Sequence, residues 1–219
     1  MRVPPDQTLS GAATGHAATL RLFIGIACPC TPVISRLLAD LPGEPEAAAD
    51  SRAAGLRVVT PDNLHITLKF IGSATKPALP DIVSAMQRAL ANCYAFTLQI
   101  RGAGSFQSAL WLGVEPNPAL SALATALNEA MAALGFAPET KPFRPHLTLA
   151  RLTHPPAIPC PTQKRLNPGF DLQTWITQHQ AGQWGNLPVT AVHLYRSDTL
   201  TDGVRYTVLS TVPLRPPAA

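Results

Sequence analysis

The 219-residue sequence lacks long apolar runs and has few charged residues. No stretch approaches the roughly 20 apolar residues that cross a bilayer, so we expect no contact with a membrane. Residues 1–19 lack the apolar segment of a signal peptide and are predicted to be a disordered tail on a single domain of residues 20–219, in a cytoplasmic protein. The 23 prolines and 14 glycines follow no period, which excludes collagen and low-complexity sequence.

Cysteine is also scarce, with four residues at positions 28, 30, 93 and 160. Without a secretion signal they do not predict a disulfide framework. Cys28-Pro29-Cys30 is one residue too short for a Cys-x-x-Cys metal hairpin, and no second pair matches it. We therefore expect ordinary reduced cysteines, with a metal or redox role as the weaker alternative.

Only 14% of the residues are charged, and the net charge is +4. Residues 141–219 contain eight basic and three acidic side chains, so this part alone has a net charge of +5. Such an excess fits a phosphate-bearing or nucleic-acid partner, and it fits a solvated basic surface equally well.

Short apolar segments and amphipathic segments alternate along the chain without a strict βαβ order or a glycine-rich phosphate loop. Strands are predicted at 21–27, 56–59, 64–71, 96–100, 109–114, 146–152, 189–195 and 205–212, and helices at 32–41, 80–90 and 118–134. Gly102-Ala103-Gly104 is predicted to be a corner. Residues 153–187, rich in Pro, Gln and Gly, are predicted to be an insertion that holds one short capped helix at 171–179. The pattern favours an antiparallel α+β fold.

A short motif occurs twice, as His65-Ile-Thr67-Leu and His146-Leu-Thr148-Leu. Because side chains alternate in a strand, each copy places an imidazole and a hydroxyl on one face and its apolar residues in the core. A single His-x-Thr is more often a structural pair. Two copies in strand-like segments, each preceded by a turn, favour a functional site.

Two histidines that titrate near neutral pH can act as an acid and base pair, and threonine hydroxyls can hold phosphate oxygens. This combination suits displacement at phosphorus and needs no metal or cofactor. A metallohydrolase fits less well, because threonines stand where metal ligands are expected and Asp62 belongs to a turn. The other histidines, at positions 16, 154, 179 and 193, are expected to be incidental.

The paired motifs resemble the signature of the two-histidine (2H) phosphoesterase superfamily. Residues 21–26, 63–72, 143–151, 194–197 and 205–208 are similar in order and spacing to its RNA 2′,3′-cyclic phosphodiesterase branch, also called the 2′-5′ RNA ligase family. The resemblance implies a bilobal α+β fold with pseudo-twofold symmetry, in which two antiparallel sheets form a central cleft and helices lie outside. It implies that His65 donates a proton, that His146 accepts one, and that Thr67 and Thr148 bind phosphate.

The same resemblance implies an enzyme that opens the 2′,3′-cyclic phosphate of an RNA end to a 2′-phosphate, with 2′-5′ ligation as the reverse reaction. We expect a monomer. Arg151 matches a family arginine and is a candidate phosphate ligand, or else a surface residue at a strand end. Phe70 is a candidate for stacking on a base, although a phenylalanine in a strand more often packs in the core. The alternatives are a 2H phosphoesterase for a small cyclic nucleotide and a non-catalytic module that binds RNA ends.

Overall fold

The computed structural model describes residues 19–42, 56–106, 109–152, 170–200 and 203–217. These ranges contain β1 (Thr19–Ala27), α1 (Pro32–Ala39), β2 (Leu56–Val58), β3 (His65–Thr75), α2 (Leu79–Leu90), β4 (Phe96–Phe106), β5 (Ala109–Val114), α3 (Pro118–Ala133), β6 (His146–Leu152), α4 (Leu172–His179), β7 (Gln183–Val189), β8 (Ala191–Leu200) and β9 (Gly203–Pro213). Short 3₁₀ turns, η1 (Pro61–Asn63) and η2 (Lys76–Ala78), precede β3 and α2. None of the described helices is long and apolar enough to cross a membrane.

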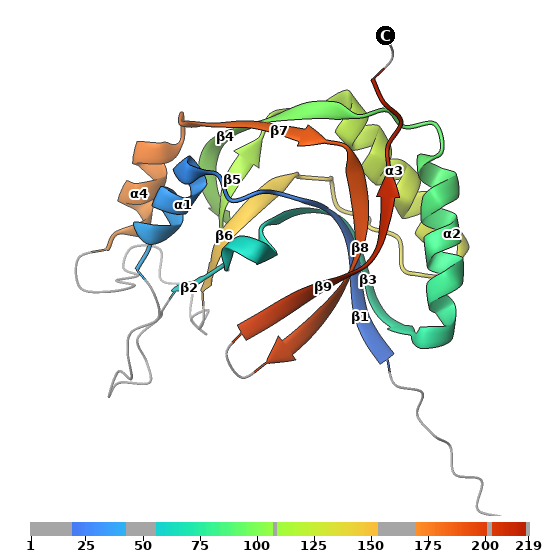
Figure 1. The fold of residues 1–219 in the computed structure, drawn as a ribbon. Coiled ribbons are helices and arrows are strands. Elements are labelled where there is room, and N and C mark those ends of the chain that lie inside the picture. Colours follow the sequence, from blue (N-terminus) through green and yellow to red (C-terminus); the bar gives the residue numbers. More distant parts are fainter. Residues whose placement is uncertain (1–18, 43–55, 107–108, 153–169, 201–202, 218–219) are drawn as a thin grey trace, which may run out of the picture.

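The strands form a curved antiparallel sheet in the order β7-β4-β5-β6-β3-β1-β8-β9, with β2 paired to β6 (Figure 1). Four strands of this order lie on each side of the contact between β3 and β6, with β2 as the ninth strand of the sheet. Only Ile66 and Leu147 pair across this contact. These are equivalent positions of the two motifs. The expected α+β fold with two halves is confirmed, and this one pairing joins the two expected sheets into a continuous one.

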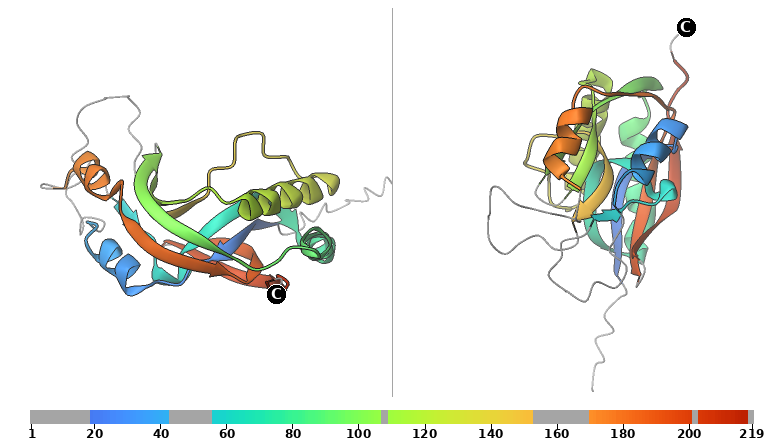
Figure 2. Two further views of the ribbon diagram at one scale, coloured as in Figure 1. Left: turned by 90° about the horizontal axis from the view of Figure 1, so that it is seen from above. Right: turned by 90° about the vertical axis from the view of Figure 1, so that its left-hand side faces the viewer.

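Helices cover the two ends of the sheet, α2 and α3 at one end and α1 and α4 at the other (Figures 1 and 2). Three of the helices begin where a side chain accepts a hydrogen bond from the first turn, as Thr31, Asn117 and Asp171 do. Proline at the first helical position favours the same starts in α1 and α3. The expected cap at Asp171 is thereby confirmed.

The core lies between these helices and one face of the sheet. Ile66 and Leu147 are fully buried there, together with Leu112 of β5 and with Ile82 and Met86 of α2. The two motifs are therefore fixed from behind by the best-packed part of the molecule, and we call the opposite face of the sheet the cleft face.

Two expectations about secondary structure are wrong. The Gly102–Gly104 segment is not a corner, because β4 continues through it to Phe106 with a register shift between Ile100 and Ala103. Gly102 has a φ of +73°, so the chain absorbs the extra residue as a bulge without leaving the sheet.

The second wrong expectation concerns residues 183–187. They were predicted to be loop at the end of the insertion 153–187, but they belong to strand β7. This strand pairs with β4 at the edge of the sheet, where Pro188 is tolerated because a strand there needs partners on one side only. The helix expected at 171–179 is present as α4. Residues 153–169 and the predicted tail, except for Thr19 at the start of β1, lie outside the described residues.

Candidate active site

The two motifs meet on the cleft face at the centre of the sheet. Antiparallel pairing of Ile66 with Leu147 sets His65 across from Thr148 and His146 across from Thr67. Each imidazole thus faces the hydroxyl of the other motif. Diagonal neighbours in such a ladder lie about 7–8 Å apart, so the two histidines are close neighbours on this face.

Both imidazoles are held in the same way. Nδ1 of His65 lies 2.6 Å from the carbonyl oxygen of Asn63, and Nδ1 of His146 lies 2.8 Å from that of Arg144. A carbonyl can only accept, so Nδ1 is the protonated nitrogen in each ring and Nε2 is the nitrogen left for chemistry. A neutral ring then presents a base at Nε2, and a charged ring presents an acid there.

Burial lowers the pKa of both histidines below the ordinary value of 6.5. The hydrogen bonds to the Asn63 and Arg144 carbonyls act in the opposite direction, and the positive charge of Arg151 lowers both pKa values further. Charge on His146 also lowers the pKa of His65. The unliganded site therefore favours two neutral imidazoles, and an anion bound between them would favour protonation.

A bulge in each motif strand decides where the residues after the threonine point. Thr67 pairs with Gly25 but Lys69 pairs with Ile24, so Leu68 is the extra residue in β3. Strict alternation would send residue 69 to the cleft and residue 70 to the core, and the bulge reverses both. Phe70 consequently lies on the cleft face with 59% of its surface exposed, and the interpretation that it packs in the core is wrong.

The second motif has its bulge at the same position. Thr148 pairs with Trp111 and Ala150 pairs with Leu110, so Leu149 is the extra residue in β6. Leu149 and Ala150 are both fully buried, and Arg151 is exposed on the cleft face. Phe70 and Arg151 are thus equivalent residues of the two halves, each brought to the site by a bulge.

The bulge in β3 also places a charged residue, Lys69, inside the protein. The bulge turns its side chain into the core, where it is 3% exposed and its Nζ donates to the carbonyl of Ala137 at 2.6 Å. Burial lowers the pKa of this amine. Because Ala137 belongs to the segment between α3 and β6, Lys69 ties the first motif strand to the approach of the second.

Aromatic rings surround both imidazoles. His65 has its ring centroid 4.8 Å from Phe23 and 4.9 Å from Tyr206, which meets it edge-on. His146 has Phe106 edge-on at 5.0 Å and Trp111 at 6.3 Å. The sequence did not single out these aromatics, because they come from four different strands and only the sheet brings them together.

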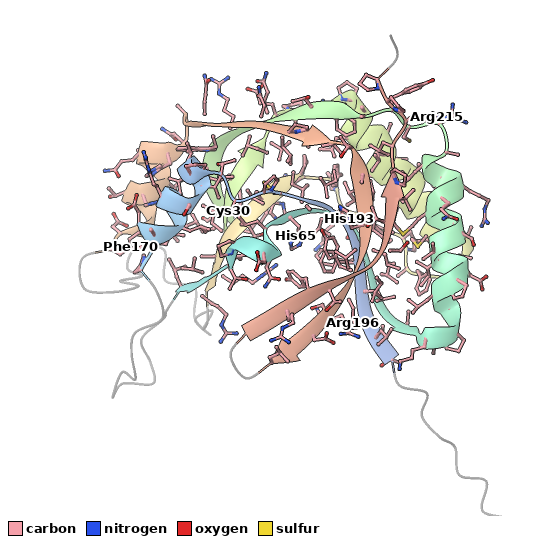
Figure 3. All side chains as sticks on the ribbon, in the orientation of Figure 1. Cys30, His65, Phe170, His193, Arg196 and Arg215 are labelled. Atoms are coloured by element: carbon pink, nitrogen blue, oxygen red, sulfur yellow. The ribbon has the colours of Figure 1, made fainter. Side chains whose placement is uncertain are left out.

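A cavity of about 430 Å³ opens beside His65. Phe23, Phe70, Arg151 and Tyr206 are among its lining residues, whereas His146 and the two threonines are not. Of the predicted site residues, the cavity therefore brings together His65, Phe70 and Arg151. The β3–β6 pairing places the other three on the same face as His65. Figure 3 shows His65 near the centre of the molecule.

The amide of Asn63 connects the first motif to the hairpin β8–β9. Its Nδ2 donates to the carbonyl of Val204 at 2.6 Å, and its Oδ1 accepts from the backbone N–H of Tyr206 at 3.2 Å. One residue thus orients His65 through its main chain and positions Tyr206 through its side chain. Sequence reasoning assigned Asn63 only to a turn, since its partners lie about 140 residues further along the chain.

The remaining cysteines and histidines have different surroundings. Burial raises the pKa of the Cys28 thiol to about 11, so it is neither a thiolate nucleophile nor a ready metal ligand. Within the described ranges, no three His, Cys, Asp or Glu side chains gather as a metal site requires. His193 pairs with Gly25 and lies on the cleft face, where its Nδ1 is hydrogen-bonded to the hydroxyl of Thr211. His179 stacks on Trp175 in α4. His16, His154 and Cys160 lie outside the described residues.

Sequence comparison identifies proteins that are similar to this chain. An RNA 2′,3′-cyclic phosphodiesterase of Methanothermobacter thermautotrophicus is 33% identical over 162 residues, which is 72% of this chain and 82% of that protein. One of the same name from Escherichia coli K12 is 32% identical over 163 residues, or 70% of this chain and 77% of that protein.

Comparison with solved structures finds proteins of similar fold. Escherichia coli LigT complexed with 3′-AMP superposes with a TM-score of 0.66 and 27% identity, over 90% of this chain and 99% of that one. A protein of Thermus thermophilus gives a TM-score of 0.65 and 25% identity, over 91% of this chain and 100% of that one. The sequence profile of the 2′-5′ RNA ligase superfamily matches residues 39–200, a range that includes both motifs. With its two bulged His-x-Thr strands paired on one cleft face, this chain belongs to the 2′-5′ RNA ligase superfamily.

Proposed function

We propose that the protein is an RNA 2′,3′-cyclic phosphodiesterase, a hydrolase that opens the cyclic phosphate at an RNA end. The observation that carries this proposal is the pairing of Ile66 with Leu147, because it sets the histidine of each motif across from the threonine of the other on one face of the sheet. Relatives with about a third of their aligned residues identical bear this name, and E. coli LigT has been solved with a nucleotide bound.

The reaction uses the two imidazoles in opposite protonation states. Neutral His146 takes a proton from water at Nε2 while the water oxygen forms a bond to phosphorus. Protonated His65 gives its Nε2 proton to the ribose 3′-oxygen as the bond from phosphorus to that oxygen breaks. The product is a 2′-phosphate, and proton exchange with solvent restores both rings.

Thr67 and Thr148 supply hydroxyls that hydrogen-bond the non-bridging oxygens, where charge builds up during the displacement. Arg151 adds a guanidinium that balances this charge and can bind two oxygens at once. Phe70, exposed on the same face, offers a ring on which the terminal base stacks. The scheme needs no metal or cofactor. The monomeric state and the cytoplasmic location stay predictions.

The test is turnover of an oligoribonucleotide with a 2′,3′-cyclic phosphate end in the presence of EDTA. We expect a product with a 2′-phosphate, and a loss of about 10²–10⁴-fold in kcat for His65→Ala and for His146→Ala. His179→Ala is the matched control, because this histidine stacks on Trp175 in α4 outside the site. Full activity in either motif variant contradicts the proposal, and a 3′-phosphate product contradicts the roles given to the two histidines.

A further inference from the structure

The cavity beside His65 is also lined by residues at the start of β1 and in β8 that the mechanism does not use. These residues are Arg21, Ser197 and Thr199. Leu22 pairs with Arg196, so the next position of this antiparallel ladder sets Arg21 beside Ser197. A guanidinium and two hydroxyls thus gather at one part of the cavity, and all three groups can donate hydrogen bonds.

The lining of this cavity has positive charge and no negative charge. Its residues include two arginines, Arg21 and Arg151, and no aspartate or glutamate. Within the described part of the chain, the exposed side chain of Arg21 makes no hydrogen bond or salt bridge. Arg196 on the opposite face of the sheet differs, because its Nε lies 2.8 Å from a carboxylate oxygen of Asp198. The guanidinium of Arg21 is therefore available to an anion, and phosphate is an anion whose oxygens its paired N–H groups fit.

Arg21 lies on the same face as the motifs but at a distance from them. Side chains alternate along β1, so Arg21 shares the cleft face with Phe23 and Gly25, and Gly25 pairs with Thr67. The four residues from Arg21 to Gly25 span about 13 Å of strand. A ribose with a phosphate on each side, met by an extended arginine side chain, spans a distance of this order. The phosphate within reach of Arg21 is therefore not the one held at the histidines but the other one on the same ribose.

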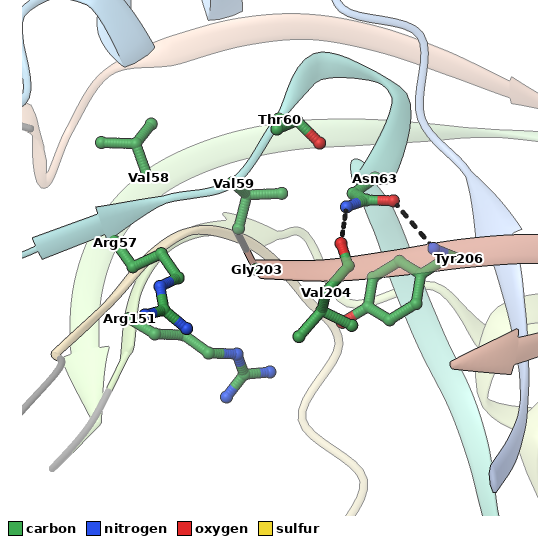
Figure 4. Close-up of a pocket in the computed structure, with 9 residues that line it drawn as sticks. All are labelled: Arg57, Val58, Val59, Thr60, Asn63, Arg151, Gly203, Val204 and Tyr206. Carbon is green, nitrogen blue, oxygen red and sulfur yellow. Dashed lines mark hydrogen bonds between the residues drawn. The ribbon is translucent and has the colours of Figure 1, made fainter. Parts of the chain in front are cut away.

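Other parts of the lining suit the sugar and the base. Val204 and Tyr206 of β9 are held in place by the side chain of Asn63, which bonds to the backbone of both (Figure 4). Phe70 adds an exposed ring to the same cavity. Aromatic and apolar groups accept a nucleoside, and a separate cluster of donors accepts its charged group. The cavity as a whole thus matches one nucleotide that carries a second phosphate.

We propose that Arg21, Ser197 and Thr199 bind a terminal 5′-phosphate on the nucleotide whose 2′,3′-cyclic phosphate lies at the histidines. A phosphate monoester has three acceptor oxygens, which the guanidinium and the two hydroxyls can all engage. A phosphodiester has only two free oxygens and leaves one of these donors unused. The inference rests on the proposed function, and it adds a substrate class, which is the nucleoside 2′,3′-cyclic phosphates that carry a 5′-phosphate monoester.

Two cyclic mononucleotides that differ only in the 5′-phosphate test this subsite. We expect the wild-type protein to favour the 5′-phosphorylated one by about 10–100-fold in kcat/KM, mainly through KM, as a hydrogen bond between charged groups gives. Arg21→Gln should lose this preference, and Arg21→Lys, which keeps the charge but not the paired donors, should keep part of it. Arg196→Gln, which removes an arginine from the opposite face of the neighbouring strand, is the control (Figure 3). A wild-type protein without the preference, or an Arg21→Gln variant that keeps it, overturns the proposal.

Binding of the products separates failure of the subsite from failure of the proposed reaction, because it needs no turnover. Calorimetry compares a nucleoside 2′,5′-bisphosphate, a nucleoside 2′-phosphate and a dinucleotide that ends in a 2′-phosphate. We expect the bisphosphate to bind more tightly than the monophosphate and Arg21→Gln to remove this difference. Equal binding of the two by the wild-type protein overturns the proposal, whether or not a cyclic substrate is hydrolysed. A larger loss of affinity in Arg21→Gln for the dinucleotide than for the bisphosphate also overturns it, because Arg21 then binds a phosphodiester.

Discussion

The side chain of Asn63 directly links the first motif to the hairpin β8–β9, whose Tyr206 contacts the ring of His65. Replacing it by alanine removes both bonds to β9, at 2.6 Å to the Val204 carbonyl and at 3.2 Å from the Tyr206 N–H. A hydrogen bond of this kind contributes about 0.5–1.5 kcal/mol net, and water can replace part of it because the region is partly exposed. We expect Asn63→Ala to lower the free energy of unfolding by about 1–2 kcal/mol.

For a chain of this length, that loss corresponds to a decrease in Tm of roughly 2–8 °C. Urea unfolding followed by tryptophan fluorescence measures it, and an unchanged slope against urea shows that the surface exposed on unfolding is the same. Asn186→Ala on the edge strand β7, where the asparagine is exposed, is the control. A value for Asn63→Ala within about 0.3 kcal/mol of the wild type shows that the amide does not anchor β9.

The same variant separates the two functions of the residue. The main-chain carbonyl of Asn63 still binds Nδ1 of His65 after the substitution, so the tautomer of the ring is kept. Tyr206 loses one backbone bond, and its edge-on contact with His65 becomes less fixed. We expect kcat to fall by about tenfold or less, against the far larger loss for His65→Ala. A loss as large as that of His65→Ala contradicts a positioning role for the side chain.

Two further predictions concern the cleft face. Because burial holds the pKa of His65 and His146 below 6.5, kcat/KM should be bell-shaped with its maximum on the acid side of that value. A pH–rate profile that is flat to pH 8 contradicts this. Gly25→Ala places a Cβ 2.9 Å from the carbonyl oxygen of Ile66, so the backbone that carries Thr67 must shift. We expect a loss of about 1–3 kcal/mol in unfolding free energy together with reduced turnover, and wild-type values for both in thermal and kinetic assays refute the reasoning.

The sequence by itself determined the two histidine–threonine pairs and most of the strands and helices, but not β7 or the course of β4 beyond Ile100. Alternation along a strand is a local property, so His65 with Thr67 and His146 with Thr148 are predictable as pairs from their spacing alone. The short helix α4 was predictable for the same reason, since its cap and its apolar spacing lie within a few residues of each other.

Only the tertiary structure decided which side chains join these pairs. The bulges at Leu68 and Leu149 depend on the register with β1 and β5, and they move Phe70 and Arg151 to the cleft and Lys69 to the core. The edge strand β7, rich in Gly, Asn and Pro, has little strand signal of its own and is defined by its hydrogen bonds to β4. Pairing between distant segments leaves no local pattern, because hydrogen bonds to a neighbouring strand do not depend on which residues stand next to each other in the chain.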